Sequence, residues 1–307
     1  MTPSGSEPGE AAPPLSPPRA DNASDAAQRA HVQAIYAAEG ATAPPDWTMA
    51  LDHLQRAAEL GHRLAQAELA ALAGDWMLAR EIGAGKTLPG AAWGDLRRSV
   101  DLRSWLAPPR PGIVSANPRI ATVEALATPE LCDWLIARAR PKLAPAGVYD
   151  HETGHQRIEN VRTNSACYFP WDDNDLLLLS LRARMAKAAE LPVSALESTA
   201  VLHYTVGQEF LPHFDFLDAA KPGHAKDIEM KGQRVLTFLI ALNDDYEGGE
   251  TEFPALSKRW KGKKGSGVFF WNVEPDGTPD RRTMHAGLPP TRGEKWLLSQ
   301  WMRARPV

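Results

Sequence analysis

The 307-residue sequence is poor in cysteine, in net charge and in long apolar runs. Its two cysteines, Cys132 and Cys167, lie among apolar residues, which favours reduced core side chains over a disulfide framework. A formal net charge of -4 gives no general basic character, so we expect neither nucleic acid nor a membrane as a partner. No apolar run is long enough to span a bilayer, and the N-terminus has neither the basic start nor the apolar core of a secretory signal. We therefore expect a cytoplasmic protein.

The sequence is long enough to bury the core of one large or two modest domains. Residues 1–30 are dominated by Pro, Ala, Ser, Gly and acids without aliphatic periodicity, a composition that predicts a disordered tail. Residues 31–112 are expected to form a helical segment followed by a helical or irregular connector. A proline-rich cluster at the end of this connector predicts the boundary of a larger domain, residues 113–307.

Within the larger domain, PRIATVEAL predicts a strand and TPELCDWLIARARPKL predicts a helix capped by Thr128, with Pro129 at its first position. A second helix is predicted at DLLLLSLRARMAKAAEL. Strands are predicted at four segments rich in β-branched and aromatic residues: ALESTAVLHYTV, RVLTFLIAL, GSGVFFWNV and EKWLLSQWM. The polar, Gly-containing middle of residues 147–169 predicts a mobile loop.

The stretch YTVGQEFLPHFD ends in a candidate metal motif, His213-Phe214-Asp215. Side chains alternate along a strand, so this spacing is expected to turn His213 and Asp215 to one face. A second histidine would complete the set of two imidazoles and one carboxylate that holds ferrous iron with positions left open. His285 is the candidate. Lys295 follows it by ten residues and is placed to hold a dicarboxylate whose other end chelates the metal.

Several ordered blocks of the sequence resemble the iron(II)- and 2-oxoglutarate-dependent dioxygenases, and among them the prolyl 4-hydroxylase-like branch. These blocks cover roughly residues 116–305 and read VRTNSAC, YTVGQEFLPHFDF, RVLTFLIALNDDYEGGETEFPAL, GSGVFFWNV and RTMHAGLPPTRGEKWLLSQW. The resemblance implies an α+β fold: a catalytic domain built as a double-stranded β-helix (jelly roll) with bracing helices, preceded by a small helical segment.

The resemblance also implies the residues that bind the cofactor and the co-substrate. Iron(II) would be held by three ligands, His213, Asp215 and His285. 2-Oxoglutarate would chelate the iron through its keto oxygen and adjacent carboxylate, while Lys295 holds the distal carboxylate. Tyr204 and Thr237 match positions that donate hydroxyl hydrogen bonds to the co-substrate, although a Thr in a strand is often only a good strand former. Ascorbate is the expected reductant.

Three further positions match residues near the substrate in the family. Arg162 either orients the substrate or ties down its loop, and Trp301 either contacts the substrate or belongs to the core. Phe210 departs from the family, since many members carry a Tyr there. The implied reaction uses oxygen, converts 2-oxoglutarate to succinate and hydroxylates an unactivated C–H bond, in a prolyl or other residue of a peptide or protein. A free amino acid or other small molecule as substrate, and a non-catalytic metal-binding scaffold, are the alternatives.

The run AAELGHRLAQAELA, residues 57–70, resembles a Sel1-like repeat, a relative of the tetratricopeptide helical pair. At most one good repeat is visible. Because solenoid repeats need stacked neighbours to bury their faces, a single copy is expected to dock on the downstream domain or on a partner protein.

Overall fold

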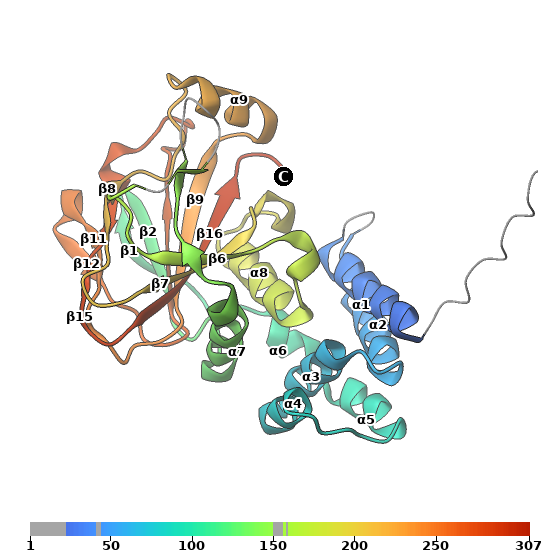
Figure 1. The fold of residues 1–307 in the computed structure, drawn as a ribbon. Coiled ribbons are helices and arrows are strands. Elements are labelled where there is room, and N and C mark those ends of the chain that lie inside the picture. Colours follow the sequence, from blue (N-terminus) through green and yellow to red (C-terminus); the bar gives the residue numbers. More distant parts are fainter. Residues whose placement is uncertain (1–22, 41–43, 150–155, 158) are drawn as a thin grey trace, which may run out of the picture.

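A computed structural model describes residues 23–40, 44–149, 156–157 and 159–307 of the chain (Figure 1). Residues 1–22 of the predicted disordered tail lie outside the described residues, as does the part of the predicted mobile loop at residues 150–155 and 158. Among the described residues, helices and antiparallel sheets are both present, and no helix is long and apolar enough to cross a membrane.

The chain enters the described structure in helix α1, Ala23–Glu39. The disorder predicted for residues 23–30 is therefore wrong. Ala27, Ala30 and Ala34 are buried, and α1 packs against helix α2, Trp47–Glu59. Alanine has the highest helix propensity, and its small side chain lets two helices approach closely, so an alanine-rich stretch without large aliphatic residues still forms a packed helix.

Helix α2 is followed by four short helices: α3 (Arg63–Leu72), α4 (Trp76–Gly83), α5 (Ala91–Ser99) and α6 (Leu102–Leu106). Helices α2 and α4 begin with aspartate caps, Asp46 and Asp75, whose side chains accept from backbone N–H groups. Gly61 has φ +90 between α2 and α3, which confirms the tight turn expected there. The predicted connector is thus largely helical.

The large sheet has eight strands among the described residues, all paired antiparallel, in the order β1-β2-β13-β9-β16-β7-β6-β3. Their bounds are β1 Gly112–Ala116, β2 Arg119–Val123, β3 Ala144–Pro145, β6 Ser165–Phe169, β7 Thr199–Tyr204, β9 Arg234–Ala241, β13 Gly267–Trp271 and β16 Lys295–Arg303. Strands β7, β9, β13 and β16 confirm the four predicted from their apolar runs. The division of the chain into domains at residue 113 stays a prediction, and β1 begins beside it.

A smaller sheet has the order β12-β11-β14-β8, with bounds β8 Phe210–His213, β11 Thr251–Phe253, β12 Lys258–Trp260 and β14 His285–Gly287. Two further strand pairs join β10 (Glu247–Gly248) to β15 (Pro290–Arg292) and β4 (Val148–Tyr149) to β5 (Gln156–Arg157). Phe253 of the smaller sheet packs edge-on against Phe270 of the large sheet, with ring centroids 5.1 Å apart. The two sheets therefore enclose a core between them.

Helices α7 (Pro129–Ala139) and α8 (Leu176–Ala188) pack on the large sheet, and their buried residues share one core with the sheet and with α1–α5. Thr128 caps α7 as predicted, accepting from the backbone N–H of Leu131 at 3.2 Å. Helix α9 (Pro222–Lys231) was not expected from the sequence, and His224 is buried in it and accepts from the N–H of Asp218.

The N-terminal helices are joined to the rest of the chain by a buried ionic contact. Glu68 of α3 lies 2.6 Å from His31 Nε2 of α1 and accepts from the N–H of Leu176, the first residue of α8. Both Glu68 and His31 are buried. A buried carboxylate is stable only when it is paired and hydrogen-bonded, so this contact holds α1 and α3 against α8. The helical segment thus packs on α8, while the domain division and its relation to the Sel1-like repeat stay predictions.

Candidate metal and co-substrate site

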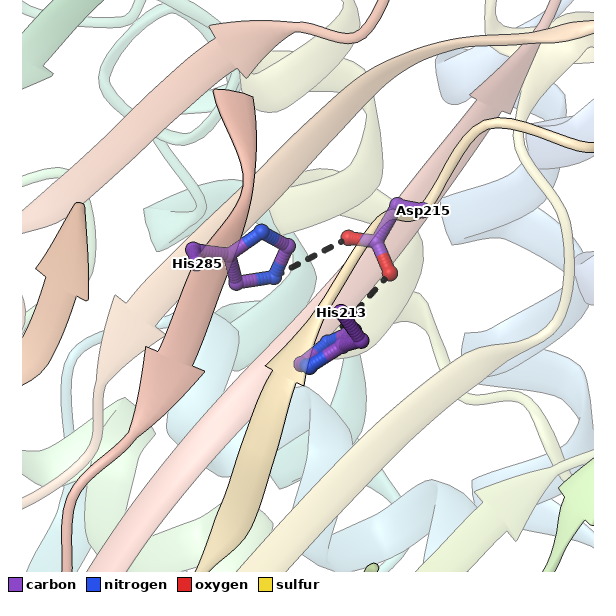
Figure 2. Close-up of side chains that lie close together, drawn as sticks. All are labelled: His213, Asp215 and His285. Atoms are coloured by element: carbon purple, nitrogen blue, oxygen red, sulfur yellow. Dashed lines mark ion pairs between the residues drawn. The ribbon is translucent and has the colours of Figure 1, made fainter. Parts of the chain in front are cut away.

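Three side chains expected to bind a metal meet at one point (Figure 2). His213 is the last residue of β8 and stands opposite His285, the first residue of β14, in the strand register. Asp215 lies beyond the end of β8, so strand alternation does not place it, although the spacing brings it to the same point. Its two carboxylate oxygens lie 3.7 Å from His213 Nε2 and 3.4 Å from His285 Nε2. One ligand atom from each residue lies within 4.8 Å of the other two.

Both imidazoles direct Nε2 toward Asp215. Nδ1 of His213 lies 2.8 Å from the carbonyl oxygen of Leu211, and Nδ1 of His285 lies 3.1 Å from that of Thr283. A carbonyl oxygen only accepts, so each Nδ1 carries the proton and each Nε2 keeps its lone pair. Burial and the neighbouring His285 lower the pKa of His213 to about 3, which favours its neutral form. Neutral imidazole is the form that binds a metal.

The carboxylate of Asp215 is held from behind. The Thr237 hydroxyl donates to Asp215 Oδ2 at 2.7 Å and itself accepts from Asn272 Nδ2 at 3.0 Å. A hydroxyl has one hydrogen to donate, and here it is directed to Asp215, so donation from Thr237 to a co-substrate stays a prediction. Burial alone raises the pKa of Asp215, but His285, His213 and the hydrogen bond from Thr237 lower it overall, so the carboxylate is ionised.

Lys295 carries a buried ammonium group at the first residue of β16. It pairs in register with Tyr204 at the end of β7, and its Nζ lies 4.9 Å from the centre of the Tyr204 ring. The side chain is only 2% exposed, and Nζ has no hydrogen-bond partner among the described residues. Burial lowers the pKa of Lys295 to about 8, while Glu250 acts weakly in the opposite direction. A buried ammonium without a partner is unstable, so the site fits an anion.

One cavity joins the metal-binding side chains to this ammonium. Its lining includes all three candidate ligands together with Lys295, Tyr204, Arg162, Phe210 and Trp301. Burial raises the pKa of Tyr204 to about 12, so its hydroxyl keeps its proton and can donate. Gly287 leaves the room that Tyr204 needs, because a Cβ at that position would lie 3.2 Å from the Tyr204 hydroxyl. The donor set fits a divalent metal, and the other end of the cavity fits a carboxylate.

Two of the three residues expected near a substrate, Phe210 and Arg162, form a stack on the metal site. The Phe210 ring lies flat on the His213 ring at 3.5 Å, and the Arg162 guanidinium lies 4.7 Å from the centre of Phe210. Arg162 also donates to Asn164 Oδ1 and to the carbonyl of Gly147. Both interpretations of Arg162 therefore have support, since it lines the cavity and ties down the preceding loop. Phe210 contributes an apolar surface where a tyrosine would contribute a hydroxyl.

Trp301, on β16, is half-buried and stacks under the Arg234 guanidinium, which lies 3.8 Å from its ring centre. It lines the cavity, so it is not only a core residue. Sequence reasoning missed Asn272, which is buried and supports Thr237. The available signal was a polar residue at the end of the apolar run GVFFW, a place where a buried amide needs a partner.

Two imidazoles and one carboxylate are a donor set typical of non-haem iron enzymes that activate oxygen. A family model described as "2OG-Fe(II) oxygenase superfamily" matches residues 199–303, which include all three candidate ligands and Lys295. Prolyl 4-hydroxylase 1 of Arabidopsis thaliana is 34% identical over 210 residues, 64% of this chain and 72% of that protein. Probable prolyl 4-hydroxylase 3 of the same plant is 33% identical over 210 residues, 62% and 71% of the two chains.

A solved structure also resembles the chain: viral collagen prolyl hydroxylase vCPH from Paramecium Bursaria Chlorella virus-1, in a 2OG complex. It is 27% identical, with a TM-score of 0.47, over 60% of this chain and 96% of that one. The chain belongs to the 2OG-Fe(II) oxygenase superfamily. It is a 2-oxoglutarate-dependent dioxygenase, and membership implies Fe(II) as cofactor, with 2-oxoglutarate and oxygen as co-substrates.

Proposed function

We propose that this dioxygenase hydroxylates a prolyl residue of a peptide or protein while 2-oxoglutarate is decarboxylated to succinate. The two plant relatives reported above, matched over 72% and 71% of their own length, are named as prolyl 4-hydroxylases, which supports a peptidyl substrate. The observation that carries the co-substrate assignment is the buried Lys295 ammonium, which has no partner among the described residues and lies in one cavity with the three metal-binding side chains.

Iron(II) would be bound by Nε2 of His213, Nε2 of His285 and a carboxylate oxygen of Asp215. When bound, the metal supplies oxygen activation coupled to decarboxylation of the keto acid and hydroxylation of an unactivated C–H bond. The chain supplies orientation. Backbone carbonyls hold both imidazoles, Thr237 holds Oδ2 of Asp215, and the buried lining of the cavity excludes water from the reacting groups.

2-Oxoglutarate would lie between the metal and Lys295. The ammonium pairs with the distal carboxylate in a charge-assisted hydrogen bond, and the Tyr204 hydroxyl donates from the neighbouring strand. Phe210 and Arg162 stack beside His213 and would form the wall on which the substrate rests. Ascorbate is proposed as the reductant that restores iron oxidised in unproductive turnover, and the cytoplasm as the location.

Finer structural assignments belong with this proposal. The two facing antiparallel sheets are proposed to form a double-stranded β-helix, since the two metal-binding histidines lie on the smaller sheet and the co-substrate cation on the larger one. The α2–Gly61–α3 hairpin is proposed to be a single Sel1-like repeat, supported by its helical pair and its positive-φ glycine.

Anaerobic visible absorbance tests the co-substrate assignment. The native protein loaded with Fe(II) should show a weak charge-transfer band on addition of 2-oxoglutarate. Lys295→Met should need a much higher concentration, and Lys258→Met, which removes an exposed lysine, should match the native protein. A band with the same concentration dependence in Lys295→Met would contradict the assignment. Mass spectrometry of proline-containing peptides then tests the substrate: one added oxygen on proline supports the proposal, and turnover only of free amino acids contradicts it.

A further inference from the structure

Two hollows lie side by side on the face that contains the metal site. The first, about 710 Å³, is the mouth above the metal and is lined by Phe210, Phe214 and Arg281 among others. The second, about 660 Å³, lies between the N-terminal helices and the catalytic domain, and extends to Glu39 of α1 and to Trp171. The two hollows share three lining residues, Tyr168, Arg234 and Trp301. The mouth therefore continues toward the helical segment.

The helical segment builds the far wall of the second hollow. Glu39, the last residue of α1, accepts from Asn174 Nδ2 at 2.8 Å and from the Trp171 side chain. The Tyr36 ring of α1 lies against Trp171, with ring centroids 4.8 Å apart. These contacts hold the Trp171 ring in one position, although both aromatic side chains are well exposed, Tyr36 at 43% and Trp171 at 41%. A fixed, exposed aromatic pair is a surface suited to stacking.

The charges along this path favour an acidic ligand. Arg281 at the mouth and Lys231 beside the second hollow are exposed cations. Two carboxylates of the second hollow are already engaged, since Glu39 is hydrogen-bonded as above and Glu197 pairs with Arg234 at 2.7 Å. Lys231 also contacts Asp227 at 3.2 Å, and half-buried Asp218 lies at the mouth, so the positive excess is modest. It stands out against a chain of net charge -4.

We propose that the N-terminal helical segment completes a second docking subsite for the polypeptide substrate, at the Tyr36–Trp171 pair. The occupant is an extended, proline-containing segment with acidic residues, which runs from the metal site past Trp301 to this pair. Prolines in a polyproline II helix stack on aromatic side chains, and acidic residues pair with the rim cations. The subsite rests on the proposed peptidyl function and extends it, because it makes recognition depend on residues distant from the target proline.

Steady-state kinetics with matched synthetic peptides test the subsite. The short substrate is an uncharged pentapeptide with one central proline. Long substrates extend it at either end by about ten residues of alternating proline and glutamate, which span ~31 Å in polyproline II. A lysine-for-glutamate version is the charge control. For the native enzyme, kcat/KM should be about tenfold higher with one of the two glutamate peptides than with the short peptide, through a lower KM.

Trp171→Ala and Tyr36→Ala should each remove that advantage and leave the short peptide unchanged, while Trp171→Phe should keep most of it. Lys231→Glu should raise KM for the glutamate peptide and lower it for the lysine peptide. Met77→Ala, which truncates an exposed residue on α4, is the control for surface changes in the helical segment. Equal kcat/KM for short and long peptides in the native enzyme, or equal losses on both peptides in Trp171→Ala, would overturn the subsite.

Failure of the proposed function gives a different result. In that case the native enzyme hydroxylates no proline peptide, although 2-oxoglutarate still forms the charge-transfer band. Fluorescence anisotropy of the labelled glutamate peptide then decides the docking question without turnover. Binding that is lost in Trp171→Ala and Tyr36→Ala, and kept in Met77→Ala, supports the subsite, whereas no binding to the native protein, or binding unaffected by both aromatic variants, overturns it.

Discussion

The two ends of the cavity differ in how completely their polar groups are satisfied. At the metal end, the Nδ1 atoms of both imidazoles meet backbone carbonyls, and Oδ2 of Asp215 accepts from Thr237. At the other end, the Lys295 ammonium is buried without a hydrogen-bond partner among the described residues. The metal end is therefore arranged by the chain itself, while the anion end is complete only when a ligand supplies the missing charge.

The two ends should therefore respond oppositely to substitution. Side chains at the metal end support one another, so removing one should lower the affinity for the metal even when no co-substrate is bound. The unpaired Lys295 ammonium lowers the stability of the ligand-free protein, and this free energy is regained when an anion binds. Its removal should therefore weaken co-substrate binding and stabilise the ligand-free protein.

Replacement of His285 by Ala should abolish iron binding. The residue supplies one of only three candidate ligands, and its loss leaves a site that cannot surround the metal. Isothermal titration with Co(II) as an oxygen-stable substitute for Fe(II) should show a loss of more than about 100-fold in affinity, above the 10–100-fold typical of losing a supporting contact. His53→Ala, on α2, is the control and should bind metal normally. Unchanged affinity in His285→Ala would remove this residue from the metal site.

Replacement of Lys295 by Met should leave iron binding unchanged and weaken the binding of 2-oxoglutarate. Loss of one partner of a buried charged pair typically costs about 2–5 kcal/mol of binding free energy. The ligand-free variant should unfold at a higher temperature than the native protein, because a partnerless buried ammonium has been replaced by an apolar chain of similar length. Calorimetry with and without 2-oxoglutarate measures both effects. A less stable ligand-free variant would mean that the ammonium has a partner in solution.

Replacement of Thr237 by Val should weaken metal binding by about 10–100-fold, because Asp215 loses the contact that orients it. Thr237→Ser keeps the hydroxyl and should restore most of the affinity. Lys295→Met should weaken 2-oxoglutarate binding by the same factor with Thr237 present and with Val in its place, since the Thr237 hydroxyl hydrogen is directed to Asp215. If Thr237→Val weakened 2-oxoglutarate and left Co(II) affinity intact, the role expected from the family resemblance would be correct after all.

Much of this arrangement could be predicted from local patterns. The apolar runs of β7, β9, β13 and β16 predicted strands because a strand buried on both faces needs a nearly continuous apolar sequence. Family resemblance pointed to His213, His285 and Lys295, and the structure brings the first two together and puts all three in one cavity. Their spacing alone could not do so, because β14 and β16 are far in sequence from β8.

The rest depended on tertiary contacts that no local pattern contains. The direction of the Thr237 hydroxyl is set by its hydrogen bond to Asp215, which lies beyond the end of strand β8. The start of α1 was missed because Ala27 and Ala30 lie buried in a helix that packs against α2 and α8, contacts that the local sequence does not show. Trp171 gave no signal of its own, since its position is fixed by Glu39 and Tyr36 from another part of the chain.

The anion end should also respond to pH. The pKa of Lys295 is lowered by burial to about 8, so the ammonium is protonated below that pH and neutral above it. Binding of 2-oxoglutarate needs the charged form, and the dissociation constant should therefore rise about tenfold per pH unit above pH 8 and stay level below it. Titration calorimetry between pH 6.5 and 9.5 measures this dependence. Lys295→Met should show none in this range, which separates the lysine from other titrating groups.

Replacement of Gly287 by Ala should produce the smallest effect. The new Cβ would lie 3.2 Å from the Tyr204 hydroxyl, so the ring must move by a few tenths of an ångström. Because Tyr204 stands beside Lys295 and is not one of the candidate metal ligands, 2-oxoglutarate should bind a few-fold more weakly while Co(II) affinity is unchanged. The double variant Gly287→Ala with Tyr204→Phe removes the oxygen that the methyl group meets, and should lose no more than Tyr204→Phe alone. A full additional loss in the double variant would show that the methyl group acts through the strand β14 and its ligand His285, and the two ends of the cavity would then be coupled through that strand.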